Sequence, residues 1–498
     1  MNVSAQAVDG AGNGVVAAGH PLTAQAGAQV LREGGNAVDA AVAAMLTSFV
    51  AEPLLTGLGA GGHMIVVHER ETALLDFFVQ APRRASDGSA AELEAVDVSF
   101  GDAVQVFYIG PASCGIYGTP AGVCTAATRW GTIPLAQLAA PAARLAREGV
   151  VLNAQQAYIA KILSDLLCST SECASLWSPG GRVLREGEVI RDPDLASAIE
   201  RLAQEGAAPF YTGEIAAAVC QMMARLGGSI TPDQLAAYEA IEREPLAVRF
   251  RDREVLTNPP PSAGGALLAY ALTLLDRAGE GPASTEQLIG AMEAAQAQRT
   301  PEFIEGLGEE GFIERFRASR LGSTTHISVL DGQGMACGVT TTNGEGSGVV
   351  VPGTGIHLNN VMGEEDLNPH GFHRHPAGRR MPSMMAPTVV MRDGEVELVL
   401  GSAGSNRIRS ALLQTILGVV DMGLSVEQAV RAPRVHFEDE TIYHEPGVDM
   451  EGVLEGERRF VRFHDLNLFF GGVQAVRRRD GQIEGAGDPR RGGVAVRA

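Results

Sequence analysis

The segment Gly322-Ser323-Thr324-Thr325-His326 holds the residues with the clearest chemical potential in this chain. A hydroxyl residue that begins a strand directly after a loop-rich segment can become a new N-terminus by self-cleavage. Its free α-amine then has a pKa of about 7.7–8.0 and can act as a base near neutral pH. Because amine and hydroxyl belong to one residue, base and nucleophile are preassembled. Threonine pairs in strands are also common simply as β-formers, so further evidence is needed.

Other familiar motifs are absent or misplaced. There is no GxSxG, P-loop or HExxH pattern. Glycines 57, 59 and 62 formally match GxGxxG, but they stand between a predicted helix and a predicted strand, the reverse of a dinucleotide-binding unit. His370, His373 and His375 lie in a Gly/Pro-rich loop without matching Cys or carboxylate spacing, which favours a solvated loop over a metal site. We therefore expect neither a metal nor a cofactor.

The predicted elements place Thr324 at the start of a sheet strand. Residues 324–330 alternate so that Thr324, His326 and Ser328 share one face, Asp331-Gly332 makes a hairpin turn, and residues 335–342 return. The remaining predictions are two helices within 20–50, a strand at 64–67, helices over most of 120–228, strands near 247–250, 254–256, 388–391 and 396–400, and a helix at about 408–423. Residues 277–322 are charged and predicted to be loop-rich. The pattern indicates helices layered over a mostly antiparallel sheet.

Composition sets limits on the partners. The 498 residues carry a formal charge of −20, which disfavours nucleic acid and anionic membranes. The most apolar stretch, 37–50, is interrupted by Asp39 and is too short to span a bilayer. The first residues show no signal-peptide pattern, and six sparse cysteines predict free thiols, so we expect a cytoplasmic protein.

Ordered blocks along almost the whole chain resemble the gamma-glutamyltranspeptidase family. The matching blocks are HPLTAQAGAQVLREGGNAVDAAVAA (20–44), EPLLTGLGAGGHMIV (52–66), YGTPAGV (117–123), PFYTGEIA (209–216), PDQLAAYEAIEREPL (232–246), NPPPSAGG (258–265), TTHISVLDGQG (324–334), PGTGIHLNN (352–360), PSMMAPT (382–388) and GSAGSNR (401–407). The resemblance implies an α+β fold, the four-layer αββα sandwich of N-terminal-nucleophile hydrolases. It also implies a precursor cut before Thr324 into a large-subunit region (1–323) and a small-subunit region (324–498) that remain one folded heterodimeric unit.

The resemblance also assigns roles. Thr324 matches the nucleophile and Thr342 the second threonine that orients it. Gly404 and Ser405 match a pair of glycines whose N–H groups form the oxyanion hole; Ser405 replaces a glycine but retains its N–H. Ser383 matches the first of two substrate-contacting serines.

The departures concentrate in substrate recognition. Phe78 stands where the family has an arginine that binds the α-carboxylate of the glutamyl group, and Phe cannot replace a bidentate guanidinium contact. Arg83 or Arg84 could compensate, although solvated surface arginines are the expected outcome. Met384 replaces the second serine, and Glu364, Glu365 or Asp366 approximately matches the acidic residue for the substrate amine. Residues 342–348 also depart from the family's usual T-L-N form.

The expected function is a self-processing threonine amidohydrolase or acyltransferase that acts on γ-glutamyl amides such as glutathione and passes the acyl group to water or an amine. Two alternatives remain open: a sister amidohydrolase with a different acyl substrate, indicated by Phe78 and Met384, and an unprocessed, non-catalytic paralogue.

Overall fold

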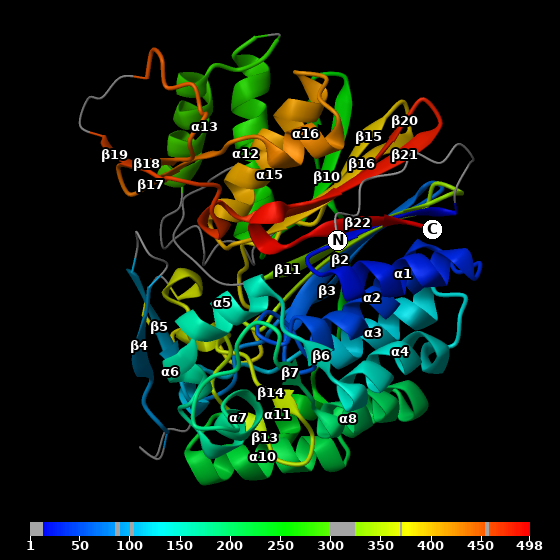
Figure 1. Cartoon of the computed structure of the whole chain (residues 1–498), viewed down its shortest axis with the longest axis vertical. Coiled ribbons are helices and arrows are strands. Elements are labelled where there is room, and N and C mark those ends of the chain that lie inside the picture. Colours follow the sequence, from blue (N-terminus) through cyan, green and yellow to red (C-terminus); the bar gives the residue numbers. More distant parts are fainter. Residues whose placement is uncertain are drawn as a thin grey trace.

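Two antiparallel sheets packed face to face form the centre of the protein, with helices on both outer faces (Figure 1). The computed structural model describes residues 13–84, 90–99, 104–279, 281–298, 324–368, 371–453 and 458–498. The layers run helix, sheet, sheet, helix, which confirms the predicted αββα sandwich. Gly322 and Ser323, and most of the predicted loop-rich segment, lie outside the described residues.

The first sheet has the strand order β22-β1-β11-β12-β2-β3-β8. Its strands are β22 (Val494–Arg497), β1 (Gly14–Ala18), β11 (Thr325–Asp331), β12 (Ala336–Thr342), β2 (Gly61–His68), β3 (Glu71–Phe77) and β8 (Ile241–Arg243). The hairpin predicted at Asp331 joins β11 to β12, with Thr325 opposite Thr341. Strands that precede Thr324 in the sequence and strands that follow it are therefore interleaved within one sheet.

The second sheet has the order β21-β20-β16-β15-β10-β9. Its strands are β21 (Gln482–Gly487), β20 (Gly472–Arg479), β16 (Glu395–Ala403), β15 (Thr388–Arg392), β10 (Arg253–Thr257) and β9 (Leu246–Phe250). Alternating residues of the two inner faces, among them Ile65, Leu330, Val399 and Val476, interdigitate to form the core between the sheets.

Helices α1 to α11 cover the first sheet or extend that half of the molecule. They are α1 (Pro21–Arg32), α2 (Ala37–Ala51), α3 (Thr119–Arg129), α4 (Leu135–Glu148), α5 (Ala154–Ile162), α6 (Ser164–Leu167), α7 (Ser171–Trp177), α8 (Pro193–Glu205), α9 (Ala208–Tyr211), α10 (Glu214–Leu226) and α11 (Pro232–Ala236). Side chains cap the first two helices: His20 accepts from the Leu22 N–H, and Asn36 forms a capping box with Asp39. Every residue of α2 is buried, as its small, apolar sequence predicts.

Among the described residues, four helices cover the second sheet: α12 (Ala263–Arg277), α13 (Thr285–Ala297), α15 (Arg407–Val420) and α16 (Val426–Arg431). The prediction of a loop-rich segment from 277 onward was wrong over α13. Ser284 and Gln287 form a capping box there, and Ile289 and Met292 are buried against the core, so a short apolar stripe stabilises a helix despite the charged composition. The helix predicted at 408–423 begins at Arg407 and ends at Val420.

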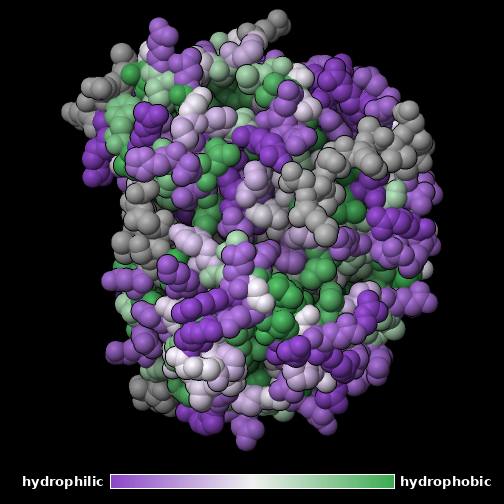
Figure 2. Space-filling view, in the orientation of Figure 1, coloured by the Kyte–Doolittle hydropathy of each residue, from purple (hydrophilic) through white to green (hydrophobic). Residues whose placement is uncertain are grey.

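Short ribbons complete the described structure. They are β4 (Glu94–Ser99) with β5 (Val104–Ile109), β6 (Val150–Val151) with β7 (Val189–Ile190), β13 (Val350–Val351) with β14 (Ile356–His357), and β17 (Val435–Glu438) with β18 (Thr441–His444) and β19 (Arg459–Arg462). The face in Figure 2 is largely hydrophilic, with hydrophobic residues showing only in patches. Within the described ranges, no helix is both long and apolar enough to cross a membrane.

Candidate active site

Four residues form one row across the first sheet at one end of its strands; three of them are predicted site residues, and the fourth is Gly61. Thr341 pairs with Thr325 and with Gly62, and Gly62 pairs with Phe77. The next row, one residue closer to this end of the sheet, consists of Thr324, Thr342, Gly61 and Phe78. Residues in one row of an antiparallel sheet point to the same face. Thr324 and Phe78 are 3% and 1% exposed, so the row is buried where the two sheets meet.

Gly61 is needed in this row for steric reasons. A Cβ on Gly61 would lie 3.0 Å from the Phe78 Cα and 2.8 Å from the Val79 N, too close for any side chain. Gly59, Gly61 and Gly62 therefore serve close backbone approach, whereas Gly57 has open space around it, and a strand and not a helix follows them.

The second sheet brings Gly404 and Ser405 to the same edge. His326 lies two residues after Thr324 on its face of β11, and a Cβ on Gly401 of β16 would lie 2.2 Å from the His326 Cε1. Leu330 packs with Val396 at the other end, so the two strands run in opposite senses and β16 leads from Gly401 toward Thr324. Gly404 and Ser405 follow directly where β16 ends and α15 begins.

The backbone at Gly404 and Ser405 is unusual. Both residues have positive φ, +109° and +61°, which costs an L-residue such as Ser405 roughly 1 kcal/mol. The turn closes with hydrogen bonds from the Arg407 and Ile408 N–H groups to the carbonyls of Gly404 and Ser405. The N-terminal turn of a helix presents backbone N–H groups and positive dipole charge, which suits an anionic oxygen.

Arg491 adds a positive charge beside this turn. Its Nη2 would be 3.2 Å from a Cβ on Gly404, and its Cδ packs on Gly472. Burial and the neighbouring Arg407 lower the pKa of Arg491 to about 10, while Asp488 and Glu345 oppose this. The buried Nε of Arg491 has no hydrogen-bond partner among the described residues.

On the opposite face of the first sheet, Glu52 supports the start of β11. It caps the C-terminus of α2, is 1% exposed, and accepts hydrogen bonds from the Thr325 Oγ1 at 2.7 Å and the Thr23 Oγ1 at 2.9 Å. Burial raises the pKa of Glu52 to about 7, against the effect of the two hydroxyls and Arg491. The residue next to Thr324 is therefore fixed by a buried carboxyl group.

Phe78 lies in an apolar cluster. Its buried neighbours are Val79, Ala81, Val361, Met362, Leu367, Met381 and Met385. These residues come from the end of β3, from the segment after Asn359-Asn360, and from the loop before β15. The position that would carry a carboxylate-binding arginine in the family thus packs against hydrocarbon and thioether groups, with the His63 ring also 5.5 Å from the Phe78 ring.

The arginines near Phe78 in the sequence or in space already have other partners. Arg83 is 72% exposed and lies 3.8 Å from Asp233, and Arg84 donates to the Ala91 carbonyl at the surface, so neither takes over the missing contact. Arg380, which the sequence did not reveal, is buried beside Phe78. Its Nη1 donates to the Phe78 carbonyl at 2.6 Å, its Nη2 to the Glu239 carbonyl at 2.7 Å, and its Nε lies 3.2 Å from Asp76.

The other predicted substrate residues separate into two environments. Ser383 is buried, and its Oγ accepts from the Met385 N–H at 2.9 Å. Met384 packs in the core between the second sheet and its helices, whereas Met385 joins the Phe78 cluster. The structure therefore does not bring Met384 together with Phe78; its neighbour takes that place.

Glu364 is the buried member of its acidic group. A Cβ on Gly344 would lie 2.8 Å from the Glu364 Oε1, which places this carboxylate against the turn after Thr342. Glu365 is exposed, and the side chain of Asp366 lies outside the described residues. The Thr342 Oγ1 accepts from the Gly344 N–H at 2.9 Å, so the same turn fixes both Thr342 and the approach to Glu364.

The histidine loop offers no metal site in the part of the chain that is described. No group of three His, Cys, Asp or Glu residues there could hold a metal ion. His375 contacts the Leu367 carbonyl through Nε2 at 2.7 Å, His373 is half-buried, and His370 lies outside the described residues.

Comparison with known proteins identifies the family. The gamma-glutamyltranspeptidase family model matches residues 23–498. The chain belongs to the gamma-glutamyltranspeptidase family. It is 32% identical to the glutathione hydrolase proenzyme of Escherichia coli, covering 96% of this chain and 90% of that protein, and 31% identical to the acylase ACY 1 proenzyme of Pseudomonas sp. strain SE83, covering 97% and 93%.

A solved structure supports the fold. The cephalosporin acylase from Bacillus halodurans superposes with a TM-score of 0.83 at 24% identity, covering 100% of this chain and 99% of that one. The α+β N-terminal-nucleophile hydrolase fold is thereby confirmed. The chain is an amidohydrolase of the gamma-glutamyltranspeptidase family, a family whose relatives at about 30% identity include both glutathione hydrolases and acylases.

Proposed function

We propose that this chain is a self-processing amidohydrolase in which Thr324 is the nucleophile. The observation that carries this proposal is the position of Thr324: it directly precedes β11 and is buried at the end of the first sheet, next in the row to Thr342 and on the face toward Gly404. Cleavage before Thr324 would divide the chain into regions 1–323 and 324–498 that share both sheets. The names of the E. coli and Pseudomonas relatives, both proenzymes, support this reading.

Each step of the proposed reaction uses a group of this site. In processing, the Thr324 hydroxyl attacks the carbonyl carbon of the preceding peptide bond, its proton passes to the departing Thr324 nitrogen, and water hydrolyses the resulting ester. In turnover, the freed α-amine takes the hydroxyl proton while Oγ1 attacks the substrate amide. The N–H groups of Gly404 and Ser405 hold the oxyanion, the amine product leaves with the proton, and water or another amine takes the acyl group.

We further propose that the acyl group is not γ-glutamyl but largely apolar. The environment of Phe78 supports this: Phe78 packs in a buried apolar cluster, the neighbouring Arg380 is held by Asp76 and two carbonyls, and Arg83 points to solvent. A buried α-carboxylate without a cationic partner would be strongly disfavoured at this end of the row. The similarity to an acylase of Pseudomonas is consistent with this choice.

γ-Glutamyl amides such as glutathione are the second candidate. The 32% identity to the E. coli glutathione hydrolase favours them, and the buried Glu364 is placed to receive a substrate amine. Under this alternative, a cation other than the arginine missing at position 78 would have to bind the α-carboxylate.

Two anilides separate these candidates. Purified, processed enzyme is assayed with hexanoyl-p-nitroanilide and γ-glutamyl-p-nitroanilide, with Thr324→Ala as the inactive control. We expect kcat/KM for the hexanoyl substrate to be at least about tenfold higher, a difference of about 1.4 kcal/mol in transition-state stabilisation. A preference for the γ-glutamyl anilide would reject the apolar acyl group but leave the nucleophile assignment intact.

A further inference from the structure

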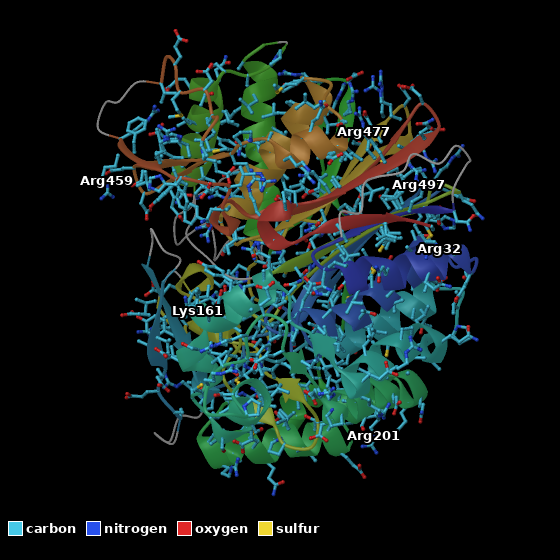
Figure 3. All side chains as sticks on the ribbon, viewed as in Figure 1. Arg32, Lys161, Arg201, Arg459, Arg477 and Arg497 are labelled. Carbon is cyan, nitrogen blue, oxygen red and sulfur yellow. The ribbon has the colours of Figure 1, made fainter. Side chains whose placement is uncertain are left out.

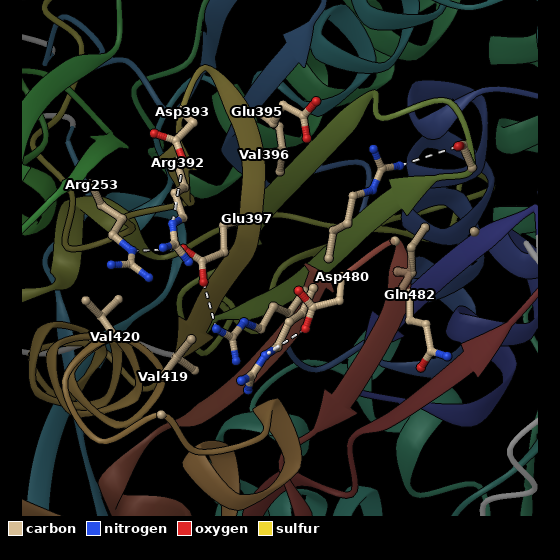
Figure 4. Close-up of a pocket in the computed structure, with 18 of the residues that line it drawn as sticks. Arg253, Arg392, Asp393, Glu395, Val396, Glu397, Val419, Val420, Asp480 and Gln482 are labelled. Atoms are coloured by element: carbon tan, nitrogen blue, oxygen red, sulfur yellow. Dashed lines mark hydrogen bonds and ion pairs between the residues drawn. The ribbon is translucent and has the colours of Figure 1, made fainter.

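A large cavity lies at the end of the sheets opposite Thr324. It has a volume of about 1120 Å³ and is enclosed by the turns at Asp393 and Asp480, by Gly332 at the end of β11, and by α15 (Figure 4). β16 runs from Glu395 at this cavity to Ala403 beside Gly404, and nine strand residues span about 30 Å. The cavity is thus separate from the candidate active site.

Two arginines share one carboxylate at the base of this cavity. Glu397 accepts hydrogen bonds from the Arg253 Nε at 2.9 Å and from the Arg477 Nη2 at 2.7 Å. These side chains are at most 11% exposed. Arg253 also pairs with Asp252, but that side chain is 60% exposed and its charge is screened by water. The buried group therefore holds more positive than negative charge, and burying unbalanced charge is costly unless an anion compensates it.

The donors of Arg477 are not all used. Its Nη1 donates to the Leu424 carbonyl at 3.2 Å and its Nη2 to Glu397, but its buried Nε has no hydrogen-bond partner in the described part of the chain. A guanidinium N–H without a partner in a buried position loses hydration without replacement, so a ligand oxygen there would be stabilising.

The rim of the cavity adds two accessible guanidinium groups. Arg392 and Arg479 are 51% and 57% exposed. Their neighbouring carboxylates, Asp393 and Asp480, are 3.7 and 3.4 Å away and about nine-tenths exposed, so these pairs are weak. Both arginines can turn toward a bound anion. Figure 3 shows Arg477 and Arg497, also of this cavity, on the same side of the molecule.

The charge of the cavity lining is positive, whereas the net charge of the whole chain is negative. Six arginines and four carboxylates line the cavity, an excess of two positive charges in a chain whose net charge is −20. The surrounding negative field disfavours general anion binding, so a positive cavity would concentrate anions at one place. Val419 and Val420, at the end of α15, also line the cavity.

We propose that this cavity binds a small multivalent oxyanion, carrying phosphate or carboxylate groups on a compact skeleton. Guanidinium groups match the geometry of both oxyanions, and arginines on several sides require more than one anionic group. The volume of about 1120 Å³ lies just above the range of roughly 300–1,000 Å³ for small-molecule sites. Because the cavity joins strands from both sheets and from both sides of Thr324, its ligand would stabilise the whole folded unit.

Calorimetric titration of the full-length protein with inorganic triphosphate and, separately, citrate tests the proposal. The rim double variant Arg392→Gln/Arg479→Gln changes exposed side chains only and should fold normally. The matched control is Arg147→Gln/Arg182→Gln, two exposed arginines paired with Glu200 and Glu188 far from the cavity.

We expect saturable one-to-one binding of at least one anion, with affinity at least about tenfold weaker in the rim variant and unchanged in the control. Binding of triphosphate alone would identify phosphate groups, and binding of citrate alone carboxylate groups. Absence of saturable binding of both anions at millimolar concentration, or equal weakening in the control variant, would overturn the proposal.

Discussion

Glu52 gives the fold a pH dependence whose size follows from its environment. Its carboxyl group is fully buried between Thr23 and Thr325, and burial raises its pKa from 4.5 to about 7. In the unfolded chain, the pKa returns to its ordinary value. Between these two values the folded protein holds a proton that the unfolded chain has lost.

The sign and magnitude follow directly. A folded state that binds more protons loses stability as pH rises, so the contribution of Glu52 is fully present below 4.5 and is lost as pH passes through about 7. At 1.36 kcal/mol per pKa unit, the difference amounts to about 3 kcal/mol. An unfolding entropy of about 2.1 cal/mol/K per residue over 498 residues converts this into a Tm change of about 3 °C.

The variant Glu52→Gln removes the titrating group and keeps the side-chain shape. Both it and the parent should carry Thr324→Ala, so that any self-cleavage does not alter the species that melts. Tm is measured by calorimetry at about pH 5 and about pH 8. We expect the parent to lose about 2 °C more than Glu52→Gln over this range, because part of the contribution is already lost at pH 5, and the exposed control Glu33→Gln to behave like the parent. Equal losses in the parent and in Glu52→Gln would refute the assignment of a proton to this buried carboxyl group.

Substitutions at three further positions test the site. Thr342→Ala removes the hydroxyl that accepts from the Gly344 N–H, so kcat should fall at least about tenfold while the protein still folds; unchanged kcat would remove Thr342 from the proposed machinery. Ser405→Gly keeps the N–H and relieves the positive φ, so activity should persist with a Tm about 1 °C higher, whereas the β-branched Ser405→Val should lower kcat at least about tenfold; equal activity of the two variants would argue against the oxyanion role. Phe78→Arg should shift the ratio of kcat/KM toward γ-glutamyl-p-nitroanilide, and an unchanged ratio would contradict the substrate argument.

Local sequence signals were sufficient for several of the helices and strands. The alternation around Asp331 and the caps at His20 and Asn36 act over a few residues, and the structure has that hairpin and those helix starts. The same register places Thr324 beside Thr342. Phe78 was singled out by the family resemblance alone, and the structure places it directly after β3, which pairs with β2.

The remaining features depend on contacts between distant segments. Glu52 and Thr325 are 273 residues apart, and the only sequence signal for Glu52 was an acidic residue at the end of an apolar helix. Arg380 and Arg491 belong to arginine-rich stretches in which exposed and buried side chains look alike. Met384 and Met385 are adjacent in sequence but pack in different clusters, since neighbouring side chains of extended backbone point to opposite sides. The loop-rich prediction failed at α13 because a single cap and a short buried stripe outweighed composition.

Intact-mass spectrometry of the purified protein before and after incubation tests the central claim most directly. If Thr324 is the self-generated N-terminal nucleophile, the 52.1 kDa chain separates into two polypeptides, the smaller beginning with Thr324, while Thr324→Ala remains whole. A wild-type chain that stays full-length, or a Thr324→Ala variant that is cut at the same bond, would contradict it.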